Sequence, residues 1–286
     1  MSARPEREDR PDERRMTFFE HLEELRQRGK VVIIVVMVLF VFFLIFSIQP
    51  FVFDSRVIFL PVPGFLFYDP AYGNDPISSQ VFRALVSYLK PPGVNLTGGE
   101  PWAGAVVQLK VAFFLAIVVA SPLIAYEFAK FVGPGLKPSE KRVIFRIAAP
   151  IIVLFITGVI VGLLYVLPFT FDLLYAIQRT LGVDIYLLFM DDFISFVLTF
   201  LVAFGLAFEL PVIMYALTQA GLVKPEFWVK NWRYAVIGIF VFGAAITPDG
   251  SGITMLVVSI PMLLLYGLGY MFILRGQRMM TRAKSS

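Results

Sequence analysis

The chain has 286 residues, of which 58% are hydrophobic, with a formal net charge of +4 and a mean hydropathy of +0.79. This apolar share is well above that of an ordinary soluble domain, and the apolar residues come in long blocks. The chain has no cysteine and a single histidine, His21, which excludes disulfides, thiolate chemistry and clustered imidazole metal sites. The composition indicates a membrane protein with no metal site. Basic residues gather at the ends of the apolar blocks, which argues against nucleic acid as a partner.

Six apolar segments are candidates to cross a bilayer as helices, which takes roughly 20 residues each. They are residues 31–48, 107–129, 143–167, 193–217, 234–246 and 253–274. We expect residues 1–16 to form a charged, flexible tail, residues 17–275 the membrane domain, and residues 276–286 a second tail. The fifth segment reaches only about 20 Å as a helix, so it must thin the bilayer or pack against its neighbours. The predicted fold is an all-α polytopic membrane protein with six transmembrane helices.

The distribution of Lys and Arg predicts how these helices are oriented. Twenty of the 25 basic residues lie before the first segment, after the last one, or in and beside the loops that follow the second and fourth. The other five lie on the opposite side and are Arg56, Arg83, Lys90, Lys110 and Arg179. Because the more basic side faces the cytoplasm, both chain ends are predicted to be cytoplasmic.

The first outer loop, residues 49–106, is too long for a simple turn. It contains a possible amphipathic helix over 77–89, in which Val81, Leu85 and Tyr88 fall on one face. We therefore expect this loop to be ordered and to form a cap over the outer side. The second outer loop, residues 168–192, is aromatic-rich and is expected to lie partly in the membrane interface.

Residues 17–28 are predicted to form an amphipathic helix on the cytoplasmic surface that leads into the first span. Thr17 and Glu20 have the spacing of a capping box at its start. One interpretation is a solvated helix in which Glu24 pairs with Arg28 one turn later, a contact worth only a few tenths of a kcal/mol. The other is a functional surface that presents its carboxylates to a ligand.

A second cytoplasmic motif covers residues 131–142. Its Gly-Pro-Gly sequence ends one helix, and Pro138 with Ser139 begins the next. Glu140 falls in the first turn, where the helix dipole favours a carboxylate. The motif predicts either a well-formed helix start or a fixed carboxylate that binds a cation.

Glu209 lies inside the fourth apolar segment. An ionisable group at such a position is costly, and it is a functional-site hypothesis by default. Pro211 loosens the helix nearby because it has no N–H donor. The alternative is a carboxyl that a neighbouring helix satisfies. Glu127, near the cytoplasmic end of the second segment, is a lesser case of the same kind.

Together, residues 21–28, 131–142 and 204–211 resemble the TatC family, the six-span core subunit of the twin-arginine protein translocase. The resemblance covers nearly the whole chain from about residue 17. It implies a protein of the prokaryotic cytoplasmic membrane that binds twin-arginine signal peptides and recruits single-span TatA/TatB-type subunits. It further implies an oligomeric assembly that exports folded proteins with the proton gradient as driving force, without enzymatic activity and without a cofactor.

The resemblance also implies roles for single residues. Glu24 and Glu140 look like the two cytoplasmic carboxylates that receive the paired arginines, whose guanidinium forks bind carboxylates in a way that lysine cannot copy. Glu209, followed by Pro211, resembles the intramembrane position that faces the single-span partners. Further residues that match family positions are Arg26, Phe131, Pro134 and Leu136 at the cytoplasmic surface, Pro122 in the second span, and Asp249 in the last outer turn.

Two other functions stay open on the sequence alone. A proton-coupled secondary transporter would use Glu209 to carry the proton, although the chain shows no internal repeat of the kind such transporters have. A purely structural membrane scaffold would tolerate charge-neutral changes at Glu24, Glu140 and Glu209. Both are less consistent with two motifs placed at the cytoplasmic surface.

Overall fold

The computed structural model describes residues 18–53, 56–63, 75–91, 93–132, 138–180, 182, 187–219, 221, 223–247 and 252–285. The helices are α1 (Phe18–Ile45), α2 (Ile77–Leu89), α3 (Ala103–Val132), α4 (Pro138–Val161), α5 (Leu167–Thr180), α6 (Met190–Phe208), α7 (Leu210–Gln219), α8 (Pro225–Lys230), α9 (Trp232–Ile246) and α10 (Ile253–Ser285). A π-helical turn, Gly162–Val166, joins α4 to α5. The strands are β1 (Phe46–Phe53), β2 (Arg56–Pro63), β3 (Asn95–Thr97) and β4 (Leu187–Phe189).

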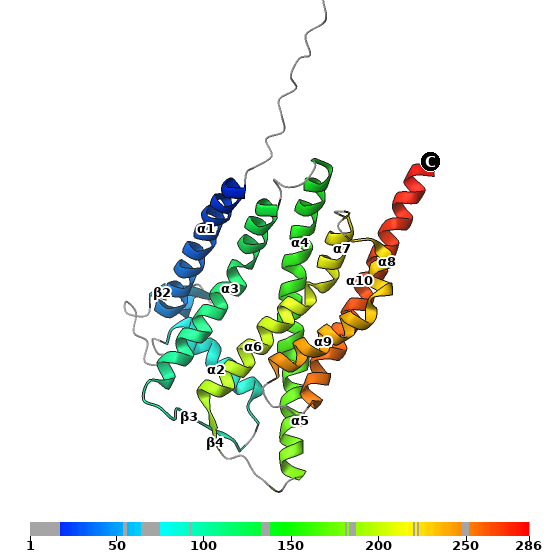
Figure 1. Ribbon diagram of the computed structural model, residues 1–286. Coiled ribbons are helices and arrows are strands. Elements are labelled where there is room, and N and C mark those ends of the chain that lie inside the picture. The colour runs from blue at the N-terminus through cyan, green and yellow to red at the C-terminus, as the bar shows by residue number, and fades with distance from the viewer. Residues whose placement is uncertain are drawn as a thin grey trace, which may run out of the picture.

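Five helical stretches in the described part of the chain are long and apolar enough to cross a membrane. They are Leu22–Ile45, Ala103–Phe128, Ala149–Thr180, Met190–Gln219 and Ile253–Gly276. A shorter apolar helix, Trp232–Ile246, has 15 residues and rises about 22 Å. The predicted six-span helical membrane fold with one short span is confirmed. One end of the bundle holds the start of α1, the start of α4 and the C-terminal end of α10 (Figure 1).

The structure corrects the predicted limits of several helices. α1 is one continuous helix, so the expected surface helix and the first span are a single element. α10 continues to Ser285, so the residues of the predicted second tail up to 285 are helical. The predicted tail over residues 1–16 and the cap at Thr17 lie outside the described residues.

Residues 168–180 were expected in an outer loop and are instead helical, as part of α5. Pro168 cannot donate a hydrogen bond to the carbonyl of Leu164, which would normally end or kink a helix. The hydroxyl of Tyr88 in α2 donates to this carbonyl at 3.1 Å. A partner from another element therefore helps to satisfy the backbone where the proline interrupts it, and the helix continues.

The first outer loop is ordered around α2, as predicted. α2 has the expected limits and packs against α3 and α5. Leu85 is buried and Val81 half-buried, whereas Tyr88 is exposed. The loop also holds strands that the sequence analysis did not predict. β1 and β2 form an antiparallel hairpin, and β3 pairs in parallel with β4, which ties the first outer loop to the segment before α6.

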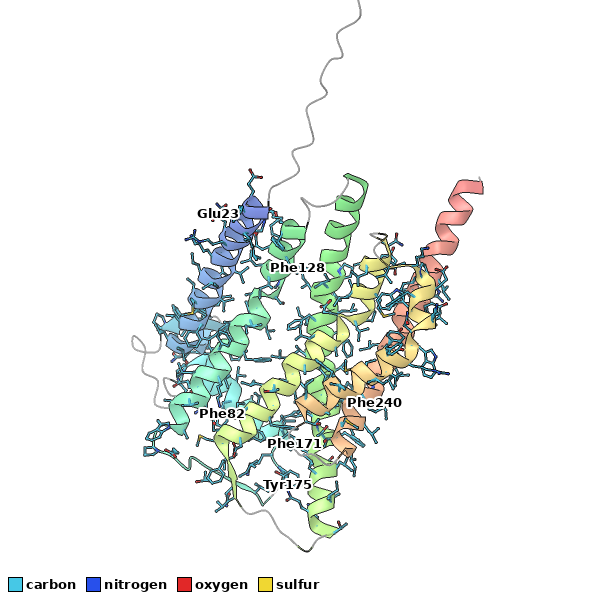
Figure 2. All side chains as sticks on the ribbon, in the orientation of Figure 1. Glu23, Phe82, Phe128, Phe171, Tyr175 and Phe240 are labelled. Atoms are coloured by element: carbon cyan, nitrogen blue, oxygen red, sulfur yellow. The ribbon has the colours of Figure 1, made fainter. Side chains whose placement is uncertain are left out.

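α6 is the most buried of the membrane helices, and Phe200 and Phe204 are almost completely enclosed. It packs against α3 and α4. The approach to α4 depends on glycine, because a Cβ on Gly158 would lie 2.6 Å from the backbone oxygen of Phe204. Small residues at such a crossing let the two backbones come close, which is how membrane helices gain packing contacts. Figure 2 shows Glu23 and Phe128 toward the end where α4 begins, and Phe82, Phe171 and Tyr175 toward the opposite end.

Candidate functional site

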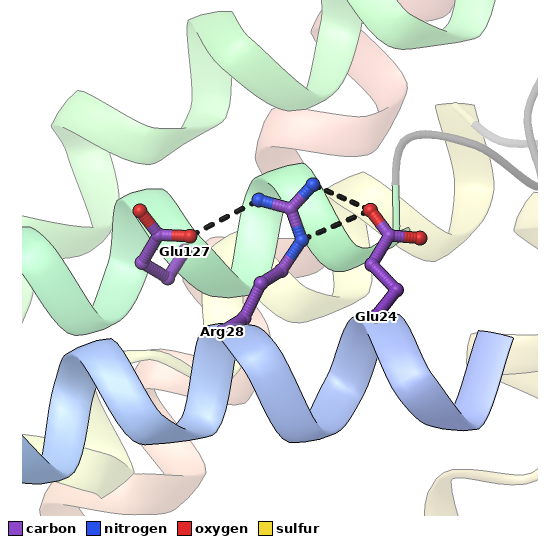
Figure 3. Close-up of polar contacts among 3 residues, drawn as sticks. All are labelled: Glu24, Arg28 and Glu127. Carbon is purple, nitrogen blue, oxygen red and sulfur yellow. Dashed lines mark hydrogen bonds and ion pairs between the residues drawn. The ribbon is translucent and has the colours of Figure 1, made fainter. Parts of the chain in front are cut away.

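A charged pair lies on one face of α1, close to the start of the helix. Glu24 and Arg28 are four residues apart, a spacing that puts two side chains on the same face. The Nε of Arg28 donates to Oε1 of Glu24 at 3.0 Å, and Nη2 contacts the same oxygen (Figure 3). The local contact that the sequence offered as one interpretation is therefore present.

The guanidinium of Arg28 also reaches a second helix. Its Nη1 donates to Oε2 of Glu127 in α3 at 3.0 Å, so it joins two carboxylates on different helices. In Figure 3 the carboxylates lie on opposite sides of the guanidinium. A planar fork of donors suits this arrangement, whereas an ammonium group is a point charge. We call Glu24, Arg28 and Glu127 the Arg28 bridge.

Burial separates the Arg28 bridge from an ordinary surface ion pair. The side chains of Arg28, Glu24 and Glu127 are 24%, 14% and 13% exposed. The neighbouring pair Arg26–Glu23 has an N–O distance of 3.4 Å, and its side chains are 66% and 51% exposed. An exposed pair contributes about 0–1 kcal/mol, whereas removing one partner of a fully buried pair costs about 3–5 kcal/mol. Because the Arg28 bridge is partly buried, we expect its contribution to the free energy of unfolding to lie between these two limits.

Two predicted site residues lie on the same helices as the Arg28 bridge. Arg26 is exposed, and its guanidinium pairs with Glu23. Phe131 is half-buried near the end of α3, one turn after Glu127. A side chain at this position can shape the surface around the bridge.

The remaining predicted surface residues are placed only in part. Glu140 lies in the first turn of α4, which begins at the same end of the bundle as α1 (Figure 1). The side chain of Glu140 lies outside the described part of the structure, as do Pro134, Leu136 and Asp249. That the carboxylate of Glu140 lies close to that of Glu24 therefore stays a prediction. Pro122 lies inside α3 and is exposed.

The predicted fourth span is interrupted at Glu209. α6 ends at Phe208 and α7 begins at Leu210, with Glu209 between them. The backbone N–H of Glu209 donates to the carbonyl of Leu206 at 3.1 Å, which is a tighter turn than the α-helix makes. Pro211 follows directly and has no N–H to continue the ladder, which accounts for the break.

The carboxyl of Glu209 is buried in the bundle, with the residue 7% exposed. Neither of its oxygens makes a hydrogen bond of normal geometry to a described residue. The backbone of Phe155 in α4 is a nearby polar group, but it does not reach this geometry. In this chain the carboxyl thus faces α4 instead of the open lipid side, and its contact with a partner subunit stays a prediction.

Sequence reasoning missed two ion pairs between helices. It treated Glu127 as a lesser candidate, although an acidic residue near the basic end of an apolar span is itself a signal for a partner such as Arg28. It also assigned no partner to Asp191, which lies in the first turn of α6. In the structure Oδ1 of Asp191 lies 2.6 Å from Nζ of Lys110, and this ammonium also donates to Oγ of Ser195 at 2.8 Å.

The Arg28 bridge is suited to ion-pair exchange. A carboxylate that already accepts a guanidinium of its own chain has the position and partial burial to accept one from another molecule. Within the described residues, no group of three or more His, Cys, Asp or Glu is placed to hold a metal ion. The fold and this site define a polytopic membrane protein with a partly buried carboxylate–guanidinium bridge at one end of its helices.

Comparison with known proteins identifies the family. Residues 20–261 match the family model described as Sec-independent protein translocase protein (TatC). The chain is 38% identical over 263 residues to Sec-independent protein translocase protein TatC of Cenarchaeum symbiosum, covering 92% of this chain and 96% of that protein. The identity to the protein of the same name from Aquifex aeolicus is 33% over 251 residues, with 88% and 92% covered. The chain belongs to the TatC family.

Solved structures agree with this assignment. The fold is similar to a crystal structure of the twin arginine translocase receptor TatC in DDM, with a TM-score of 0.70 and 29% sequence identity. The match covers 88% of this chain and 98% of that one. A second crystal structure of the same receptor gives a TM-score of 0.65. The resemblance inferred from the three motifs is confirmed, and the chain is a multi-pass membrane component of the Sec-independent protein translocase.

Proposed function

We propose that this chain binds the paired arginines of a twin-arginine signal peptide at the end of the bundle where α1 and α4 begin and α3 ends. Glu24 and Glu140 accept one guanidinium each. The bound chain then recruits single-span TatA/TatB-type subunits and exports folded proteins across the prokaryotic cytoplasmic membrane, with the proton gradient as driving force. It works as part of an oligomer, with both chain ends cytoplasmic, and it uses no cofactor and catalyses no covalent reaction.

One observation carries this proposal. Glu24 already holds a guanidinium through Nε and Nη2 of Arg28, so its position, orientation and partial burial suit the group that it is proposed to bind. A fork that approaches a carboxylate in this way forms a charge-assisted contact, roughly twice as strong as a neutral one. The backbone position of Glu140 at the start of α4, on the same end of the bundle, supports a second contact for the adjacent arginine.

The test is peptide binding by the purified full chain in detergent. The probe is a synthetic peptide with an Arg-Arg pair followed by an apolar stretch, and the reference is the same peptide with Lys-Lys. Glu24→Gln and Glu140→Gln should each weaken binding of the Arg-Arg peptide by about tenfold or more, since each removes a charge-assisted contact. Glu23→Gln is the matched control, because Glu23 is on the same helix, is exposed, and pairs with Arg26 three residues away. Unchanged affinity in the Glu24/Glu140 double variant would refute the site.

The proposed recruitment of partners involves Glu209. A carboxyl without a hydrogen-bond partner among the described residues can accept a donor from an inserted helix, and polar contacts of this kind hold membrane helices together. The break at Glu209 gives the chain a place where α6 and α7 can separate slightly to admit such a group. Crosslinking to a single-span subunit from a position beside this break would be lost in Glu209→Leu.

The same buried carboxyl supports a second candidate function, a proton-coupled secondary transporter. An intramembrane carboxyl at a helix break is a common element of proton relays. This function predicts that the lone chain, reconstituted in vesicles, takes up a small molecule when a proton gradient is imposed. The translocase proposal predicts no uptake by the lone chain and export only with its partner subunits.

A further inference from the structure

The Arg28 bridge already occupies the carboxylate that is proposed to receive a ligand. Nε and Nη2 of Arg28 both contact Oε1 of Glu24, and the Glu24 side chain is only 14% exposed. A second guanidinium cannot present the same fork to this oxygen while Arg28 remains there. The other oxygen of this carboxyl, Oε2, is buried. Binding of an incoming arginine at Glu24 therefore requires that the resident guanidinium move.

We propose that Arg28 competes with the signal-peptide arginine for the carboxylate of Glu24. When the ligand displaces Arg28, Glu127 keeps its ion pair with the displaced guanidinium. This inference rests on the function proposed above for Glu24. The exchange breaks the Glu24–Arg28 ion pair and forms one between Glu24 and the ligand. No covalent bond changes.

Glu127 makes this exchange possible at a low cost. Its contact with Arg28 uses Nη1 at 3.0 Å, a different donor from the Nε and Nη2 that contact Glu24. The contact can thus persist after Nε and Nη2 have left Oε1 of Glu24. Without Glu127, the displaced guanidinium would remain partly buried with no carboxylate, which is unfavourable. Glu127 is therefore a positioning residue that acts through Arg28.

The competitor sets a threshold for binding. When a binding site is free for only a fraction of the time, the apparent Kd rises by the inverse of that fraction. This factor is the same for every ligand that must displace Arg28, so it leaves the ratio of affinities for Arg-Arg and Lys-Lys peptides unchanged. Its effect is to raise, by one common factor, the concentration that any cationic ligand needs to occupy the site.

A charge-matched variant separates competition from simple electrostatics. Arg28→Gln combined with Glu127→Gln removes one positive and one negative charge, so the summed formal charge of the three side chains is unchanged. Glu127→Gln alone removes the group that retains the displaced guanidinium. Arg28→Lys keeps the charge at this position but cannot bridge both carboxylates as a fork does. Lys30→Gln, at an exposed position two residues beyond Arg28, controls for the loss of a nearby cation.

The measurement is the Kd of the purified full chain for the labelled Arg-Arg and Lys-Lys peptides, with thermal unfolding of each variant as a check on folding. Because the chain has no cysteine, a thiol dye can be confined to the peptide. We expect the double variant to bind both peptides about tenfold more tightly, by the same factor. Arg28→Lys should give a smaller gain in the same direction, and Glu127→Gln should weaken binding about threefold. Lys30→Gln should change the Kd little.

Two results would overturn the inference while leaving the proposed function intact. One is that the double variant and Arg28→Lys bind no tighter than the wild type although Glu24→Gln still weakens binding. The other is that both variants lose their folded state, which would make the Arg28 bridge a structural link between α1 and α3. If instead the wild type does not prefer Arg-Arg over Lys-Lys, or Glu24→Gln has no effect, the proposed function itself fails.

Discussion

Lys110 near the start of α3 and Asp191 near the start of α6 form an ion pair of 2.6 Å. The Arg28 bridge holds α3 at Glu127, about 25 Å further along the helix axis. α3 is thus fixed to α6 toward the capped end and to α1 at the opposite end. Because α3 is held at both ends, it keeps the Arg28 bridge in a fixed position relative to α6.

The Lys110–Asp191 pair should stabilise the fold as a coupled unit. Lys110→Met or Asp191→Asn alone leaves the other group without its partner, so each should lower the unfolding temperature in detergent. The double variant should lose less than the sum, with a coupling of about 1 kcal/mol, since the side chains are 37% and 40% exposed. Asp192→Asn, at an exposed neighbouring position, is the control. Additive losses would show that the pair contributes nothing of its own.

The close crossing of α4 and α6 should tolerate no side chain at Gly158. A Cβ there would lie 2.6 Å from the backbone oxygen of Phe204, and a backbone atom cannot move aside as a flexible side chain can. We expect Gly158→Ala to destabilise the protein by about 1–3 kcal/mol and to reduce the folded yield. Gly267→Ala in α10 is the control, because its Cβ would meet nothing within 4 Å. Equal unfolding temperatures for the two variants would contradict this account of the crossing.

Local sequence was sufficient for the elements whose cause is local. The apolar runs that become α1, α3, α6 and α10 are long enough to leave no other structure in a bilayer. α2 was predicted with its observed limits because its apolar residues recur at helical spacing. Glu209 was found as a candidate because charge is costly inside an apolar segment, whatever the rest of the fold does. Glu24 was found through the resemblance of residues 21–28 to a known family.

Sequence was insufficient wherever a distant partner decides the outcome. Pro168 is a position where a helix is expected to end. The helix continues with the help of the Tyr88 hydroxyl of α2, which donates to the freed carbonyl of Leu164. The strand pairs β1–β2 and β3–β4 depend on neighbours that bring the segments together. Glu127 pairs with Arg28, which lies 99 residues away in the chain, and no local sequence pattern indicates that these two residues are in contact.

The outer cap should depend on the buried face of α2. Leu85 is 7% exposed and belongs to the core cluster that includes Val107 and Phe171. We expect Leu85→Ala to lower the free energy of unfolding by about 2–5 kcal/mol, because it leaves a cavity in this cluster. Ser87→Ala, at an exposed position of the same helix, should change it by less than about 0.5 kcal/mol. Limited proteolysis of the cap can serve as a second measurement, with faster cleavage expected only for the leucine variant.

The buried carboxyl of Glu209 should lower the free energy of unfolding of the chain, although export requires it. Neither oxygen has a hydrogen-bond partner of normal geometry in the described structure, so the group bears a desolvation cost that a leucine of similar size would not. Glu209→Leu should therefore raise the stability of the purified chain by about 1–3 kcal/mol, measured by thermal unfolding in detergent. The same variant should lose export in cells, because a leucine offers nothing to a donor on a partner helix.

Glu209→Gln tests which property of this residue matters. The amide keeps a polar group of the same shape, so it can still bind a partner donor while it can carry no proton. Export retained by Gln and lost in Leu would support a role in helix recruitment, whereas export lost in both would favour a role for the proton. If Glu209→Leu instead destabilised the chain, the carboxyl would have to be satisfied in the membrane by a group outside this chain, such as a water molecule that enters at the break between α6 and α7. The stability of the leucine variant thus decides whether the carboxyl of Glu209 bears a desolvation cost in the chain before any partner binds.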